Sequence, residues 1–336
     1  MDAIRCEDLT RTFRVLGSRQ NGAPRRAFTG SPLSRSYQQV QAVAGVSFVV
    51  PEGQIVGYLG PNGAGKSTTI KMLTGVLRPS AGRISVLGLD PSRERQRLCA
   101  QIGVLFGQRS QLWWDIPLIE SLIALRYVYA LRPQDFQAQL AVLRELLQLD
   151  AFLQTPVRQL SLGQRMRGEI AAVLLHRPRM LFLDEPTIGV DAVGKAALRQ
   201  FVLDLNRTGG VTILLTSHDL GDIESVCDRV LLLHQGRLIG DGSPRQIAER
   251  FGVRPILVLH FPRGRDDAAQ SVSSLLPPGC TAEVRPDGSA AVSFDRTAVT
   301  PPQILARLGH LPIVDFRLEE ASLAGAFLKV YAEGGA

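Results

Sequence analysis

The chain has 336 residues, of which 45% are hydrophobic and 21% charged, and its formal net charge is +7. This balance excludes a disordered chain, and the length allows two domains. No apolar run approaches the ~20 residues of a membrane helix, and the polar start is unlike a signal peptide, so we expect the chain to stay where it is made.

The four cysteines are far apart and have no metal-ligand spacing, which predicts reduced, buried thiols. The excess positive charge is almost entirely arginine, and part of it lies in the first 35 residues. A basic arm could bind acidic lipid headgroups or nucleic acid. Scattered charge is more commonly a solvated surface, which is the favoured interpretation.

In chain order, the first predicted element is an edge strand at residues 3–15. The next stretch, 16–36, is rich in Gly, Ser, Pro and Arg, lacks periodicity and is predicted to be a flexible surface excursion. The first third then continues with strands at 40–50 and 54–59, a helix at 69–77, and strands at 83–87 and 102–106.

Residues 117–150 are predicted to be mostly helical, because leucines recur at three- and four-residue spacings, with a break at Pro133. Beyond residue 160, helices at 161–176, 192–207, 219–227 and 244–251 alternate with strands at 179–184, 211–216, 229–233 and 236–240. This alternation predicts an α/β fold: a mainly parallel sheet with antiparallel edge strands, helices on both faces and a helical insert at about 107–170.

The character of the sequence changes near Gly252, so the predicted domains are 1–252 and 253–336. The second is predicted to be a small α+β accessory domain without a recognisable motif. Its expected elements are a strand at 256–261, a helix at 266–276, a hairpin at 280–294, a helix at 302–308, and a strand plus helix within 313–331.

The stretch Gly60-Pro61-Asn62-Gly63-Ala64-Gly65-Lys66-Ser67-Thr68 fits the phosphate-binding pattern G-x-x-x-x-G-K-[ST]. It lies between an apolar strand and a helix, where backbone N–H groups and the helix dipole bind phosphate. Lys66 can reach the β- and γ-phosphates, and the Ser67 hydroxyl can ligate Mg²⁺.

A pair of carboxylates, Asp184-Glu185, ends the apolar run that starts at Met180. A strand buried on both faces presents such groups at the carboxyl edge of the sheet, beside the phosphate loop. Asp184 is therefore a candidate for holding Mg²⁺ through water, and Glu185 for polarising an attacking water. The alternative is a simple acidic turn after a core strand.

The segment Leu160-Ser161-Leu162-Gly163-Gln164-Arg165 opens a helix, with Ser161 as its cap and Gly163 allowing a phosphate to approach the backbone. Together with the phosphate loop, Asp184-Glu185 and His218, it resembles the nucleotide-binding subunit of ATP-binding-cassette (ABC) transporters, a P-loop NTPase. The family signature is Leu-Ser-Gly-Gly-Gln, and Leu162 stands at its first glycine. The resemblance implies that Ser161, Gly163 and Gln164 contact the nucleotide.

Three further residues take roles from this resemblance. Gln108 resembles the glutamine that senses Mg²⁺ and the γ-phosphate and links to the membrane subunit. Asp191 ends the loop that crosses between paired subunits, and His218 resembles the switch histidine at the γ-phosphate; alone, a histidine after a strand would more commonly be a capping residue.

The family also stacks an aromatic ring on adenine. Tyr37 has the usual spacing before Gly60, and Phe13 is the alternative if residues 16–36 loop out.

The sequence segments 106–115 and 161–167 resemble the corresponding segments of ATPase subunits of ABC-2-type exporters, such as drug-resistance and sodium-efflux ATPases. Trp113 and Trp114 then either receive a permease helix or pack between the helical insert and the sheet. The resemblance implies an ATP- and Mg²⁺-dependent ATPase that forms a homodimer, or a pseudo-symmetric pair of nucleotide-binding domains, around ATP. It also implies that the protein powers export through a separate membrane permease, lies at the cytoplasmic face of the cell membrane and does not bind nucleic acid. Alternatives are an importer ATPase, or a soluble ABC-type ATPase acting on nucleic acid or ribosomes, which only the basic charge supports.

Overall fold

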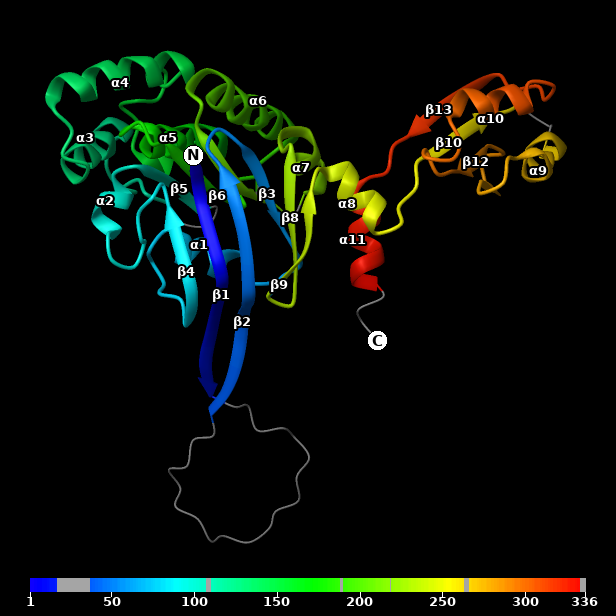
Figure 1. Ribbon diagram of the computed structural model, residues 1–336. Coiled ribbons are helices and arrows are strands. Elements are labelled where there is room, and N and C mark those ends of the chain that lie inside the picture. The colour runs from blue at the N-terminus through cyan, green and yellow to red at the C-terminus, as the bar shows by residue number, and fades with distance from the viewer. Residues whose placement is uncertain (17–36, 107–109, 188–189, 218, 263–265, 333–336) are drawn as a thin grey trace, which may run out of the picture. The chain divides into compact units, whose positions relative to one another are not determined.

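The computed structural model describes residues 1–16, 37–106, 110–187, 190–217, 219–262 and 266–332 (Figure 1). The chain divides into two compact units, Met1–Asp241 and Gly242–Ala336. This division lies about ten residues before the boundary expected near Gly252, because helix α8 (Pro244–Arg250) packs against the last helix of the chain, α11 (Leu323–Ala332).

The first unit is built on a six-stranded sheet with the order β5-β6-β7-β3-β8-β9. The first five of these strands pair in parallel, and β3 and β7 are buried at every position, as expected for strands covered on both faces. This confirms the predicted mainly parallel sheet. The strands are β3 (Ile55–Leu59), β5 (Ile102–Phe106), β6 (Met180–Asp184), β7 (Thr212–Thr216), β8 (Arg229–His234) and β9 (Arg237–Gly242).

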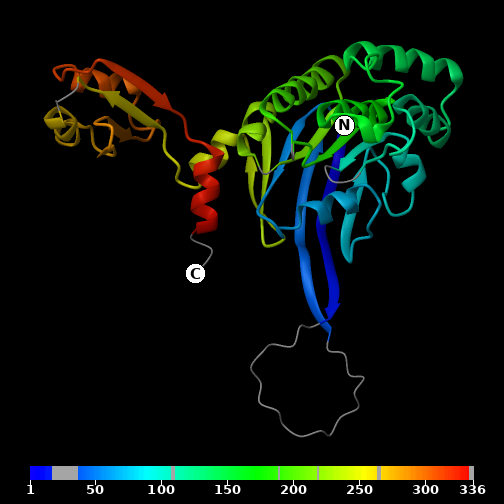
Figure 2. The same cartoon turned by 180° about the vertical axis from the view of Figure 1, so that it is seen from behind.

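A second, antiparallel sheet has the order β2-β1-β4. Its strands are β1 (Asp2–Leu16), β2 (Tyr37–Pro51) and β4 (Ala81–Val86), and β1 and β2 run side by side as a long ribbon in both views (Figure 1 and Figure 2). The prediction of an edge strand at 3–15 was wrong. Because β4 pairs with β1 on the side opposite β2, with Ile4 facing Val86, β1 is the middle strand.

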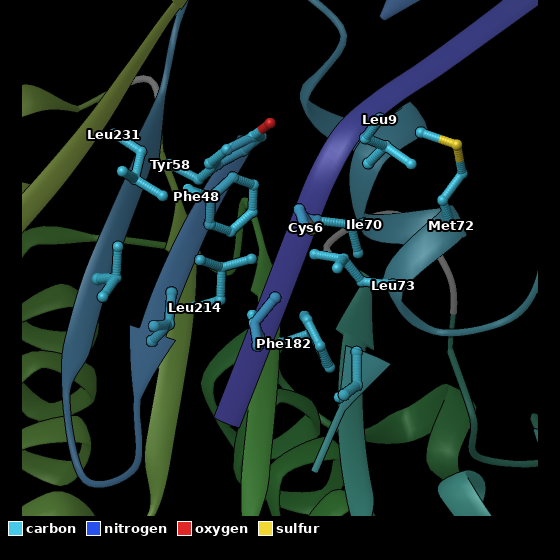
Figure 3. Close-up of a cluster of buried hydrophobic side chains, with 14 of the residues drawn as sticks. Cys6, Leu9, Phe48, Tyr58, Ile70, Met72, Leu73, Phe182, Leu214 and Leu231 are labelled. Carbon is cyan, nitrogen blue, oxygen red and sulfur yellow. The ribbon is translucent and has the colours of Figure 1, made fainter. Parts of the chain in front are cut away.

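The core of the first unit lies between the two sheets and surrounds helix α1 (Lys66–Leu73). Figure 3 shows side chains of α1 meeting Cys6 and Leu9 of β1, and Phe182 of β6 lying in the same buried cluster. All four cysteines are free thiols, as predicted, but only Cys6 and Cys227 are buried, and burial raises the pKa of Cys6 to about 12.

The remaining helices of this unit follow the prediction with one addition, the short α2 (Arg95–Cys99). Pro133 does divide the helical insert, because it opens α4 in its first turn. Ile170 and Val173 of α5 and Leu198 of α6 line a small apolar cavity with Leu105 of β5 and Leu181 of β6, so these helices cover the sheet face opposite α1. The helices are α3 (Leu118–Val128), α4 (Pro133–Leu146), α5 (Leu162–Leu174), α6 (Ala192–Gly209) and α7 (Leu220–Val226).

The second unit contains an antiparallel sheet of order β11-β12-β10-β13. Between α8 and α11 the elements run β10 (Ile256–His260), α9 (Asp266–Leu275), β11 (Thr281–Val284), β12 (Ala290–Ser293), α10 (Pro301–Leu308) and β13 (Asp315–Glu319). This β-α-β-β-α-β succession with that strand order is the split βαβ, or ferredoxin-like, arrangement. The predicted elements are present, and α9 and α10 supply Val272 and Ile304 to its core.

None of the helices in the described part of the chain is long and apolar enough to cross a membrane.

Candidate nucleotide site

The phosphate loop runs from the end of β3 into the first turn of α1, as predicted. Gly65 has φ +102°, and a Cβ added there would lie 2.4 Å from the carbonyl oxygen of Ala42 in β2. At Gly60 (φ +157°) a Cβ would lie 2.6 Å from the Leu233 oxygen. Glycine is therefore required at both positions, by conformation and by close backbone packing.

The turn between β8 and β9 supports the loop from outside the motif. Gly236 N donates to the Ala64 oxygen (3.2 Å), and Ala44 N donates to the Gly236 oxygen (2.8 Å). Asn62 and Gly63 are exposed at the tip of the loop, whereas Ser67 and Thr68 are half-buried in the first helical turn. The loop is thus held firmly at its base and is open at its tip.

Lys66 is only 6% exposed and folds back over its own loop. Its Nζ donates to the carbonyl oxygens of Gly60 (2.7 Å) and Pro61 (3.1 Å). Burial lowers the pKa of Lys66, and the charges of Glu185 and Asp184 oppose that shift. The ammonium therefore lies within the field of both carboxylates that the sequence singled out.

Asp184 and Glu185 lie at the carboxyl end of β6, where Thr216, at the end of β7, bonds to the Asp184 carboxylate and to the Glu185 backbone. Thr216 Oγ1 donates to Asp184 Oδ1 (2.7 Å) and accepts from Glu185 N (3.0 Å). Glu185 has φ +57°, an uncommon conformation for a residue with a side chain, and such strain is concentrated at functional sites. Sequence analysis missed Thr216; the available signal was a polar residue that ends a buried strand.

Sheet order explains why these groups meet. β6, β7 and β3 are neighbours, so Asp184, Thr216 and the phosphate loop all follow the carboxyl ends of adjacent parallel strands. In parallel α/β sheets this edge is where ligands bind. The fold therefore assembles Lys66, Ser67, Asp184 and Glu185 from distant parts of the sequence.

The signature segment forms a capping box at the start of α5. Ser161 Oγ accepts from Gln164 N (3.2 Å), and Gln164 Oε1 accepts from Ser161 N (2.9 Å). Leu162 is half-exposed, and a Cβ added at Gly163 would meet nothing within 4 Å. The N-terminus of this 13-residue helix is thus preformed and accessible.

Asp191 caps α6, because its Oδ1 accepts from Gly194 N (2.7 Å). The first turns of α6 are joined to the start of α7 by ion pairs of Lys195 with Asp219 (2.7 Å) and of Arg199 with Asp222. Gln108 and His218, together with Ile188-Gly189, lie outside the described residues.

The two candidates for the residue that stacks on adenine, Tyr37 and Phe13, lie at different distances from the phosphate loop along the ribbon of β1 and β2. Ala42 touches the phosphate loop, and Tyr37 lies five residues further along β2, about 16 Å away at the usual rise of a strand. Tyr37 is 60% exposed and pairs with Leu16. Phe13 pairs with Val40, only two residues from Ala42, and the Arg11 guanidinium lies 4.7 Å from its ring centroid. The structure therefore brings Phe13, and not Tyr37, toward the loop.

Comparisons with known proteins agree with this geometry. The model of the family described as ABC transporter matches residues 43–188. The Nod factor export ATP-binding protein I of Neorhizobium galegae is 32% identical over 310 residues, covering 92% of this chain and 86% of that protein. The linearmycin resistance ATP-binding protein LnrL of Bacillus subtilis (strain 168) is 29% identical over 302 residues, which cover 89% of this chain and 96% of that protein.

Among solved structures, the dimeric post-hydrolysis state of the ATP-binding cassette MJ0796, bound to ADP and Pi, shares the fold. Its TM-score is 0.57 at 21% identity, over 71% of this chain and 98% of that one. The match to the Nod factor export protein over most of both chains and the arrangement of the predicted phosphate-binding residues point to the same family. The chain belongs to the ABC transporter family, as one of its ATP-binding, ATP-hydrolysing proteins.

Proposed function

We propose that this protein is the ATPase subunit of an ABC-2-type export system and drives a separate membrane permease. The observation that carries the proposal is the joint placement of Lys66 and the Asp184-Glu185 pair at one sheet edge, with Thr216 bonded to the Asp184 carboxylate and to the Glu185 backbone. Export is supported by the similarity along nearly the whole chain to proteins named for export and for drug resistance.

In this proposal the loop N–H groups and Lys66 bind the β- and γ-phosphates of ATP. The Ser67 hydroxyl and the Asp184 carboxylate are hard oxygen ligands that fit Mg²⁺, which supplies charge neutralisation on the phosphates when bound. Glu185 polarises the attacking water. Thr216 positions that base, because the Glu185 backbone is bonded to its hydroxyl and its carbonyl group.

Two copies pair around ATP in this mechanism. The accessible N-terminus of α5, with Ser161 and Gly163, offers N–H groups to the γ-phosphate bound by the other copy. Gln108, Asp191 and His218 take the roles that the family resemblance implies. Because Ser161 and Gly163 of the other copy contact the γ-phosphate only in the closed state, ATP favours closure and hydrolysis favours opening.

The permease places the protein at the inner face of the cell membrane. Trp113 and Trp114 are 46% and 49% exposed, and Arg165 lies 4.7 Å from the ring centroid of Trp114. Exposed tryptophans are unusual away from binding surfaces, so this pair is the proposed contact for a permease helix. The proposal expects a membrane subunit to co-purify with the wild-type protein and to be lost from a Trp113→Ala/Trp114→Ala variant. It should be retained by Tyr127→Ala, which changes a more exposed aromatic residue.

The hydrolytic step is tested by Glu185→Gln. Removing a general base slows turnover by about 10²- to 10⁴-fold, while the phosphate loop remains intact. The variant should therefore bind ATP, release phosphate very slowly and accumulate as an ATP-bound dimer by size-exclusion chromatography. Glu145→Gln, which changes an exposed carboxylate on α4, should behave as wild type. Wild-type phosphate release by Glu185→Gln would rule out this role for Glu185.

A further inference from the structure

Residues 110–115, here called the 110–115 segment, lie along one face of α5. Arg165 and Glu169 are one helical turn apart on that face. Glu169 bonds to the start of the segment, Arg165 stacks on Trp114, and a Cβ added at the intervening Gly168 would lie 3.1 Å from Leu112. The 110–115 segment therefore packs along α5, the helix that begins with the signature residues.

Glu169 is the polar centre of the contact and is only 5% exposed. Ser110 Oγ donates to Glu169 Oε1, and Gln111 N donates to Glu169 Oε2 (3.0 Å). A carboxylate in such a place is tolerated only with partners. Burial raises the pKa of Glu169, whereas the two hydrogen bonds and the charge of Arg165 oppose the shift. Both oxygens are thus used, and both partners belong to the 110–115 segment.

Gln111 extends this contact into the central sheet. Its side-chain Nε2 donates to the Val104 oxygen of β5 (2.5 Å), while its backbone N–H is bonded to Glu169. β5 pairs in parallel with β6, and Phe106 stands opposite Asp184. A short path of hydrogen bonds therefore runs from α5, through Glu169 and Gln111, to the strand beside the catalytic carboxylates.

We propose that Glu169 is a positioning residue for ATP hydrolysis, which links the signature helix to the strand beside Asp184 and Glu185. Through this link, displacement of Ser161 and Gly163 at the start of α5 is passed to the catalytic end of the sheet. Glu169 itself touches no nucleotide in this scheme. The inference rests on the proposed ATP site and adds a residue that the signature pattern does not include.

The test compares Glu169→Ala with Glu169→Gln. Alanine removes both bonds, and losing charged hydrogen bonds that hold the catalytic geometry should lower kcat about 10-fold, with KM for ATP changed less than about twofold. Glutamine can still accept from Gln111 N and can donate to Ser110 Oγ, so it should retain activity within about threefold of wild type. The control is Asp241→Ala, which breaks the ion pair between Arg229 and Asp241 elsewhere in the protein. This variant should leave kcat unchanged.

Tryptophan fluorescence measures the contact between Glu169 and the 110–115 segment independently of ATP turnover. The chain has two tryptophans, Trp113 and Trp114, and both lie in the 110–115 segment, so selectively excited tryptophan fluorescence reports on this segment alone. Glu169→Ala should shift the emission and increase quenching by acrylamide, whereas Glu169→Gln should not. In a Glu185→Gln background, added Mg²⁺-ATP should change the emission, and Glu169→Ala should abolish that change.

Distinct outcomes separate failure of the inference from failure of the proposed function. Absence of ATP hydrolysis by the wild-type protein would contradict the function, whereas wild-type kcat in a folded Glu169→Ala variant would overturn the positioning role. An equal loss of kcat in Glu169→Ala and Asp241→Ala would also overturn it, because it would indicate general destabilisation. If Glu169→Ala fails to fold, Ser110→Ala removes one bond from an exposed residue, and unchanged kcat and quenching in that variant would reject the inference.

Discussion

Gly65 joins the phosphate loop to the ribbon of β1 and β2, because its backbone packs against the Ala42 carbonyl of β2. The nearest aromatic residue along the ribbon is Phe13, which pairs with Val40. Tyr37 has the expected spacing in sequence but lies at the far end of the strand. We therefore favour Phe13 as the residue that stacks on adenine.

Substitution separates the two aromatic residues. Stacking contributes about 1 kcal/mol, so Phe13→Ala should weaken ATP binding about fivefold, measured by calorimetry in the non-hydrolysing Glu185→Gln background. Tyr37→Ala is the matched control and should bind ATP as tightly as its parent. The reverse pattern, loss of affinity with Tyr37→Ala only, would contradict the assignment.

At the scale of elements, α6 and α7 are joined by two ion pairs of different burial. Asp222 is 2% exposed, accepts from Nε and Nη2 of Arg199, and has one oxygen without a hydrogen-bond partner among the described residues. The pair of Lys195 with Asp219 is far more exposed. Asp191 caps α6, so the packing of these helices fixes the position of this predicted nucleotide contact.

Removing Arg199 should therefore be the more damaging change. Arg199→Ala leaves a buried carboxylate without its cation and should lower the free energy of unfolding by about 3 kcal/mol, measured by urea denaturation. Lys195→Ala should lower it much less, because water screens that pair. The double variant Arg199→Ala/Asp222→Ala should recover part of the loss; equal losses in the two single variants would contradict the difference in burial.

The whole molecule consists of two units with separate cores, and the nucleotide residues identified above all belong to Met1–Asp241. Separate cores favour independent unfolding. The second unit is a ferredoxin-like domain of the right size to fold cooperatively.

Calorimetry should resolve two thermal transitions. Leu259→Ala removes a fully buried side chain of β10 and should lower only the transition of the second unit, by about 10 °C for a domain of this size. Mg²⁺-ATP added to Glu185→Gln should raise only the other transition, since a ligand stabilises the unit that binds it. A single transition that both changes move together would contradict independent unfolding.

Local chemistry and periodicity determined much of this protein from its sequence alone. The loop at 60–68 is contiguous, and its glycines, Lys66 and Ser67 act within one strand–loop–helix unit, so no distant residue is needed to recognise it. The alternation of helices and strands likewise predicted the parallel sheet and the elements of the second unit. This works because the buried face of a helix or strand requires apolar residues at a characteristic spacing in the sequence.

Only the tertiary structure decided which distant residues became neighbours. Strand partners are chosen by long-range pairing, which made β1 a middle strand, brought Phe13 rather than Tyr37 toward the loop, and set Thr216 against Asp184. The bonds of Glu169 to Ser110 and Gln111 join residues nearly sixty positions apart. The nucleotide motifs could thus be read as separate segments, but the residues that hold them in one geometry could not, because their contacts exist only once the chain has packed.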